Sequence, residues 1–279
     1  MSAKSVHLIE ADEVVNGYVG PPGVNGHHRE PAPQSEAGRY VSEALYWEKY
    51  YEHPAFNYEW NNGILEEKPM ADVRNAAMYR WLLKLLEAYL ETYAIAQLVN
   101  LEIGFRLALG QKTTIRKPDL FVVRHDNPVP IRDLDRNYRG ICDLCIESLS
   151  DSAQREIDRD VKTKKAEYEG VGVYEYYILD AGDTHMRFYR RTPTGDYTPI
   201  TPVNSDTIQS SVLPGFQFRI SDLHRQPTLI ELAEDELYQG FVLPQYQAAK
   251  MLATQEHDRA ERLAAKLRAS GITEDELES

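Results

Sequence analysis

Two acidic residues and a lysine in the middle of the sequence have the chemistry needed to hydrolyse a phosphodiester bond. Asp119 opens one apolar strand, Glu147 ends another, and Lys164 lies on the helix that follows. Carboxylates can hold a divalent cation, and an ammonium group can stabilise negative charge that develops on a phosphate. Mg²⁺ (or Mn²⁺) is the expected cofactor, because such an ion binds oxygen ligands and keeps several waters.

The spacing of these residues also fits arrangements without catalysis. Asp119 and Glu147 could be unrelated acids at the ends of strands. Asp160, Lys164 and Tyr168 recur every four residues and so share one helix face, where Asp160 could orient Lys164. On spacing alone, an exposed ion pair between Asp160 and Lys164, worth about a few tenths of a kcal/mol, is favoured over a catalytic lysine. A catalytic Lys164 could be replaced with little loss of stability.

The predicted elements alternate between strands and helices, which is typical of an α/β fold. An apolar stripe without glycine or proline predicts a helix over 72–93, and alternation over 141–149 places Asp143, Cys145 and Glu147 on one strand face. The other predicted elements are a helix from Val41, a hairpin around Asn61-Asn62-Gly63, strands at 96–107, 116–124, 174–179, 186–190, 197–200 and 216–220, and a helix from Arg155. The 116–124 and 141–149 strands are expected to be neighbours.

Composition divides the chain into three parts. Residues 1–40 contain many prolines and glycines and are expected to form an irregular, flexible arm, in which His27-His28 lack a third metal ligand. Residues 41–223 are predicted to form one domain, and residues 224–279 a helical extension. The polar run 246–269 could contact a partner helix or form an exposed, fraying tail.

Charge and composition limit the classes of function. The 279 residues carry a net charge of −13, so any DNA site must be a local basic patch. Without a long apolar run or a signal-peptide pattern, a cytoplasmic protein with no membrane contact is expected. Cys142 and Cys145 are too few for a disulfide framework, and on a strand they would lie on opposite faces. The histidine spacing does not favour a zinc-dependent hydrolase.

Other charged residues are expected to be solvated. Glu59, Glu66 and Glu67 lie in the predicted hairpin, where glutamates usually face water. Arg116 and Lys117 are interpreted as edge charges that discourage strand pairing between molecules. Position alone therefore gives none of them a role in the site.

Several segments, taken together and in order, resemble the Uma2 family of endonucleases. These are residues 58–66, Arg116-Lys117-Pro118-Asp119, and residues 146–150, 164–168 and 172–180. Residues 260–272 are similar to a tail that is common in cyanobacterial members. The resemblance covers residues 41–223 and this tail.

The resemblance implies a restriction-endonuclease-like core of the PD-(D/E)XK type, a mixed sheet flanked by helices. It implies that Asp119 is the first metal ligand and Glu147 the second. The lysine expected two residues after the second acid is Leu149 here, and a lysine moved to the next helix falls on Lys164. The resemblance also favours Glu66 as a supporting residue.

The implied function is Mg²⁺-dependent endonucleolytic cleavage of DNA. Ser148, next to Glu147, and Asp160, one turn before Lys164, are further supporting candidates. A homodimer is expected, because cutting both strands of a duplex requires two sites or two visits. The alternative is a nuclease fold whose site has decayed and which acts as a protein-binding or assembly module. Convergence of Asp119, Glu147 and Lys164 within reach of one cation would discriminate between the two.

Overall fold

The computed structural model describes residues 33–70, 72–100, 102–150 and 153–270. The chain divides into two compact units, Met1–Gln34 and Ser35–Ser279, and the account below concerns the second. Most of the predicted arm, including His27-His28, lies outside the described residues. The predicted domain boundaries at 40 and 223 remain predictions.

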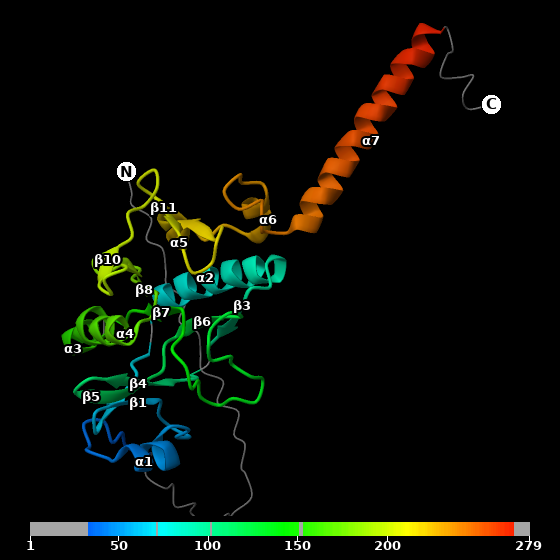
Figure 1. Ribbon diagram of the computed structural model, residues 1–279. Helices are drawn as coiled ribbons and strands as arrows, with labels where there is room; N and C mark the ends of the chain where they lie inside the picture. Colours follow the sequence, from blue (N-terminus) through cyan, green and yellow to red (C-terminus); the bar gives the residue numbers. More distant parts are fainter. Residues whose placement is uncertain (1–32, 71, 101, 151–152, 271–279) are drawn as a thin grey trace, which may run out of the picture. The chain divides into compact units, whose positions relative to one another are not determined.

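The larger sheet is mixed and has six strands in the order β10-β9-β8-β7-β6-β3 (Figure 1). Its strands are β3 (Ala96–Val99), β6 (Leu120–Arg124), β7 (Leu144–Ser148), β8 (Glu175–Leu179), β9 (Arg187–Arg191) and β10 (Tyr197–Pro199). β7 and β8 are parallel, and the other neighbours are antiparallel. β6 and β7 pair directly, as the sequence predicted.

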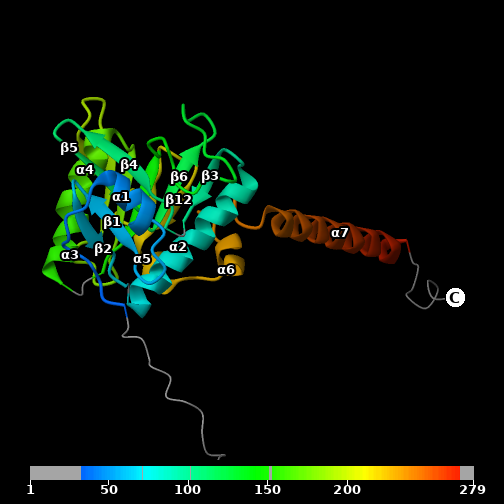
Figure 2. The same ribbon diagram turned by 90° about the horizontal axis from the view of Figure 1, so that it is seen from below.

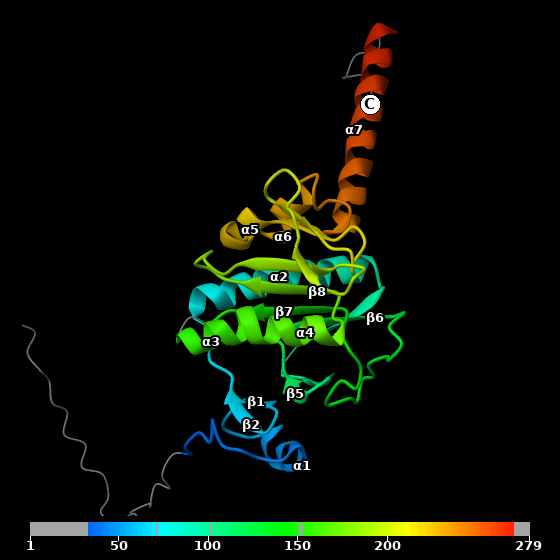
Figure 3. The same cartoon turned by 60° about the vertical axis from the view of Figure 1, so that its left-hand side comes forward.

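Helices cover both faces of this sheet (Figure 3). One face packs against α2 (Val73–Thr92), and the other against the consecutive segments α3 (Gln154–Asp158), η2 (Arg159–Lys164) and α4 (Lys165–Val171), of which η2 is π-helical. The predicted 72–93 helix is thus confirmed. Asp72 caps its N-terminus, because its carboxylate accepts hydrogen bonds from the backbone N–H groups of Arg74 and Asn75.

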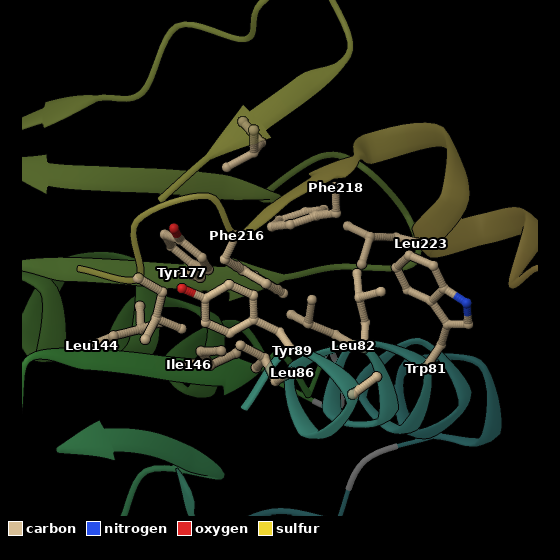
Figure 4. Close-up of a cluster of buried hydrophobic side chains, with 14 of the residues drawn as sticks. Trp81, Leu82, Leu86, Tyr89, Leu144, Ile146, Tyr177, Phe216, Phe218 and Leu223 are labelled. Carbon is tan, nitrogen blue, oxygen red and sulfur yellow. The ribbon is translucent and has the colours of Figure 1, made fainter. Parts of the chain in front are cut away.

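The predicted alternation along β7 sends its side chains to the two helical layers. Leu144 and Ile146 belong to the main core on the side of α2, with Leu82 and Tyr177 (Figure 4). Cys145 belongs to the second core, on the side of α3, η2 and α4. Burying apolar side chains of this size contributes roughly 1.5–3 kcal/mol each, which fixes the register and therefore the face on which Glu147 lies.

A smaller antiparallel sheet has the strand order β2-β1-β5-β4. Its members are β1 (Tyr58–Asn61), β2 (Ile64–Glu67), β4 (Phe105–Leu109) and β5 (Lys112–Arg116), covered by α1 (Glu43–Leu45) and the π-helical η1 (Tyr46–Tyr50). The sequence predicted one continuous strand over 96–107 and another over 116–124, and both predictions are wrong. The chain leaves one sheet and enters the other between Val99 and Phe105, and again between Arg116 and Leu120. Pro118 lacks the N–H that a continuous ladder would need.

The expectation that Cys142 and Cys145 lie on opposite faces of a strand is also wrong. The sulfur atoms of Cys142 and Cys145 lie 3.1 Å apart, and both side chains are buried. β7 begins only at Leu144, so Cys142 lies in the preceding loop and strand alternation does not apply to it.

Between β10 and residue 270 the described chain adds a small sheet and three helices. These are β11 (Thr207–Gln209), β12 (Gln217–Arg219), α5 (Ile220–Arg225), α6 (Leu229–Ala233) and α7 (Pro244–Ala269). The main core draws side chains from as far along as Val242. Figure 2 shows α7 as one unbroken helix, and no residue of it is buried. None of the described helices is long and apolar enough to cross a membrane.

Candidate active site

The pairing of β6 with β7 brings Asp119 to the end of β7. Leu120 lies opposite Ile146, so the residue before β6 faces Glu147 and Ser148. One carboxylate oxygen of Asp119, Oδ2, accepts a hydrogen bond from the backbone N–H of Ser148 at 2.7 Å. The two acids predicted from the sequence therefore lie side by side, and Ser148 positions Asp119 through its backbone.

Glu147 is a buried carboxylate with one occupied oxygen. Its Oε1 accepts hydrogen bonds from Lys164 Nζ at 2.9 Å and from the Tyr168 hydroxyl at 2.8 Å. Its Oε2 has no hydrogen-bond partner among the described residues. Burial raises the pKa of Glu147 to about 7, although the nearby lysines act to lower it. Oε2 is thus the oxygen that remains available to a cation.

Lys164 lies on η2 and is surrounded by carboxylates. Its Nζ is 2.9 Å from Glu147 Oε1, 3.1 Å from Asp160 Oδ1 and 3.3 Å from Glu59 Oε1. Only 1% of the Lys164 side chain is exposed, so the interpretation as an exposed Asp160–Lys164 pair is wrong. Burial opposes the charged form, but the three carboxylates outweigh it and raise the pKa of Lys164 well above its usual value.

Glu59 and Arg116 were expected to be solvated, and both are completely buried. Glu59 accepts hydrogen bonds from the backbone N–H of Lys117 at 2.9 Å and from Arg116 at 3.1 Å. Arg116 also pairs with Glu66 and Glu167. Burial acts to raise the pKa of Glu59, but Lys164 and Arg116 hold it well below its usual range. Because it pairs with Glu59 and Glu66 on the hairpin and with Glu167 on α4, Arg116 joins the hairpin to the helical layer.

Glu66 takes part in this network without reaching the two predicted metal ligands. Its carboxylate bonds to Arg116 and to the Asn61 amide, and 23% of its side chain is exposed. Its contact with the site is therefore indirect, through Arg116 and Glu59.

Lys68 is a site residue that the sequence reasoning missed. It follows β2 directly, and its Nζ donates hydrogen bonds to Asp119 Oδ1 at 2.8 Å and to the backbone carbonyl of Lys117 at 2.5 Å. Nothing in the spacing of the sequence indicates this contact, because it joins residues 51 positions apart.

Lys68, Asp119, Glu147 and Lys164 line one cavity of about 330 Å³ between the hairpin, the strand ends and η2. Its charged lining residues are Lys68, Glu102, Asp119, Glu147, Arg159, Asp160 and Lys164. Asp160 Oδ1 is buried without a hydrogen-bond partner among the described residues, although it lies close to Lys164. The ion pair with Lys164 Nζ at 3.1 Å compensates the charge of this buried oxygen.

The donor set fits a hard divalent cation. No group of three or more His, Cys, Asp or Glu residues in the described ranges is placed to hold a metal ion. Asp119 and Glu147 nevertheless supply two carboxylates without nitrogen or sulfur, and Mg²⁺ typically uses one or two carboxylates together with waters. A cation with mostly protein ligands, such as structural Zn²⁺, would not be satisfied here.

The mixed sheet, its two helical layers and the acids at adjoining strand ends define a restriction-endonuclease-like α/β fold. The chain belongs to the Uma2 family, whose model, described as "Putative restriction endonuclease", matches residues 43–221. A solved structure from Anabaena variabilis, described as "a putative nuclease belonging to DUF820", has a similar fold. The TM-score is 0.52 at 16% identity, over 67% of this chain and 98% of that chain. The comparison with curated proteins gives no match.

Proposed function

We propose that this chain is a nuclease that hydrolyses phosphodiester bonds in DNA with Mg²⁺ or Mn²⁺. The observation that supports the proposal most strongly is the meeting of Asp119, Glu147 and Lys164 at one cavity wall. The descriptions of the Uma2 family and of the Anabaena structure, as a restriction endonuclease and a nuclease, agree with it.

Asp119 and Glu147 would hold the cation. When bound, such an ion polarises the scissile phosphate and lowers the pKa of a bound water. Ser148 fixes the orientation of Asp119 through its N–H, which leaves Oδ1 directed toward Lys68. Glu147 contributes Oε2, since Lys164 and Tyr168 occupy Oε1. The protein thus presents one oxygen from the residue before β6 and one from β7.

Lys164 would stabilise the charge that builds up on the phosphate during cleavage. Its position is set by Glu59 and Asp160, which contact the same ammonium. Because these side chains are buried, their electrostatic interactions are screened much less than surface pairs. The role of Glu59 and Asp160 is therefore to position Lys164.

Plasmid cleavage tests the proposal. Wild-type protein should nick or linearise supercoiled DNA with Mg²⁺ or Mn²⁺ and stop when the ion is chelated. Asp119→Asn keeps the shape of the side chain but removes a charge from the site, and should lower cleavage by at least about a hundredfold. Asp133→Asn is the matched control, since Asp133 is exposed outside this cavity. Equal activity of wild type and Asp119→Asn would refute the proposal.

A further inference from the structure

Lys68 has the contacts of a second active-site ammonium. Its Nζ bonds to Asp119 Oδ1 and to the Lys117 carbonyl, and both acceptors belong to the segment that enters β6. Its side chain is 11% exposed and lines the same cavity as Glu147. The hairpin therefore delivers a cationic group to a predicted metal ligand.

The two ammonium groups of the cavity differ in how firmly they are held. Lys164 has carboxylates of Glu59, Glu147 and Asp160 within 3.3 Å. Lys68 has one carboxylate, that of Asp119, and one neutral carbonyl. Removing Lys68 from its partner thus separates a single ion pair, whereas moving Lys164 would expose three buried anions to one another.

Lys68 occupies an oxygen that a cation also needs. Asp119 Oδ2 is engaged by the N–H of Ser148, so Oδ1 is the oxygen shared between Lys68 and any incoming ion. A positive charge at 2.8 Å from a carboxylate oxygen competes with a second positive charge for the same partner.

We propose, on the basis of the proposed nuclease function, that Lys68 competes with the divalent cation for Asp119 and, once released, donates to a phosphate oxygen of the nucleic acid. Lys68 is then a catalytic residue contributed by the hairpin, in addition to Lys164. Two effects of opposite sign follow: loss of its charge strengthens cation binding and weakens cleavage.

The test measures Mn²⁺ affinity by calorimetry and plasmid cleavage for wild type and Lys68→Met, whose side chain has similar length without charge. The dissociation constant for Mn²⁺ should fall by roughly tenfold, because a competing charge is gone. The cleavage rate at saturating Mn²⁺ should fall by about a hundredfold. Lys162→Met is the matched control, because Lys162 is 70% exposed and pairs with Asp158 on the helical layer. It should change neither quantity.

A purely structural Lys68 would give a different result. Cation affinity and cleavage would then fall together in Lys68→Met, and this outcome, or unchanged affinity, would overturn the inference. Lys68→Gln supplies a second neutral variant in case the first does not fold.

If wild type binds Mn²⁺ but does not cleave DNA, the proposed function fails, while stronger Mn²⁺ binding by Lys68→Met would still support the competition. Normal cleavage by Lys68→Met would leave the proposed function intact and remove Lys68 from it.

Discussion

At the scale of single residues, the site is a cluster of buried charges. Lys164 and Glu59 have side-chain exposures of 1% and 0%, and Arg116 is equally buried. Removing such ions from water costs several kcal/mol each, and well-packed apolar residues often give equal or greater stability. Stability alone therefore gives no reason for these charges, whereas a reaction that develops negative charge does.

Replacing Lys164 tests its role and corrects an expectation from the sequence. Lys164→Met should lower cleavage by about a hundredfold to a thousandfold. Contrary to the sequence-based prediction, stability should also fall, by about 3–5 kcal/mol, because Glu59, Glu147 and Asp160 lose their common partner. Adding Glu59→Gln should recover part of the thermal midpoint but none of the cleavage. Recovery of cleavage in the double variant would show that Lys164 only neutralises the buried carboxylates around it and takes no part in the reaction.

The pKa of Glu147 predicts two pH effects. Between about pH 4.5 and about pH 7, Glu147 keeps its proton in the folded protein and has lost it in the unfolded chain. The contribution of protonated Glu147 to the free energy of unfolding is therefore lost as pH rises through 7. Glu147→Gln should therefore gain stability relative to wild type across this range, measured by urea unfolding without metal. Mn²⁺ affinity of wild type should rise with pH over the same range, since the cation binds the carboxylate. A difference in stability that is independent of pH would contradict the raised pKa.

The sequence predicted some of these residues and missed others for a physical reason. Asp119, Glu147 and Lys164 have a recognisable order along the chain, and their meeting follows from the pairing of β6 with β7. Lys68 and Glu59 reach the site only because the hairpin lies close to the residues that precede β6 and to η2. Packing between distant segments leaves no periodic pattern in the sequence.

At the scale of elements, the π-helical turn η2 differs from the helix that the sequence predicted. Periodicity predicted an ordinary helix from Arg155, and the structure has a wider turn over Arg159–Lys164. Such turns are uncommon and occur frequently at functional sites. Here the turn carries both Asp160 and Lys164 into the cavity wall.

The turn of the β1–β2 hairpin is a second element that positions the site. Gly63 has a φ of +107°, and a Cβ at this position would collide with the Tyr40 ring. Gly63→Ala should therefore destabilise the protein by about 1–3 kcal/mol and lower cleavage, because the hairpin carries Glu59 and Lys68. Gly110→Ala is the matched control, since a Cβ there meets no atom within 4 Å. Equal thermal midpoints for the two variants would count against the strained turn.

At the scale of the molecule, the site lies where the two sheets meet. Arg116 ends a strand of the smaller sheet, and Asp119 precedes a strand of the larger one. The short connection through Pro118 therefore ties the hairpin network to the predicted metal ligands. The alternation of predicted strands and helices indicated the α/β class. It did not indicate the division into two sheets, because the sequence of an apolar strand does not show which sheet the strand joins.

We propose a homodimer, with α7 as a candidate contact between copies. Several of its apolar side chains are exposed, among them Met251, Leu252 and Leu263. Sedimentation at micromolar concentration should show a dimer for the full chain and a smaller species for a chain ending at Leu243. The thermal midpoint should change little, because exposed contacts such as Lys250 with Glu234 contribute about 0–1 kcal/mol. A full chain that sediments as a monomer would contradict the dimer, and a dimeric truncated chain would exclude α7.

The central claim is that Asp119 and Glu147 hold a cation that drives cleavage, and a Mn²⁺ titration measures this most directly. Calorimetry on wild type, Asp119→Asn and Asp133→Asn would give the affinity and the number of ions bound. The account predicts a single Mn²⁺ per chain in wild type and Asp133→Asn, and a loss of affinity of at least about tenfold in Asp119→Asn. Undetectable Mn²⁺ binding by wild type, or unchanged binding by Asp119→Asn, would contradict it and favour a protein-binding module built on a nuclease fold.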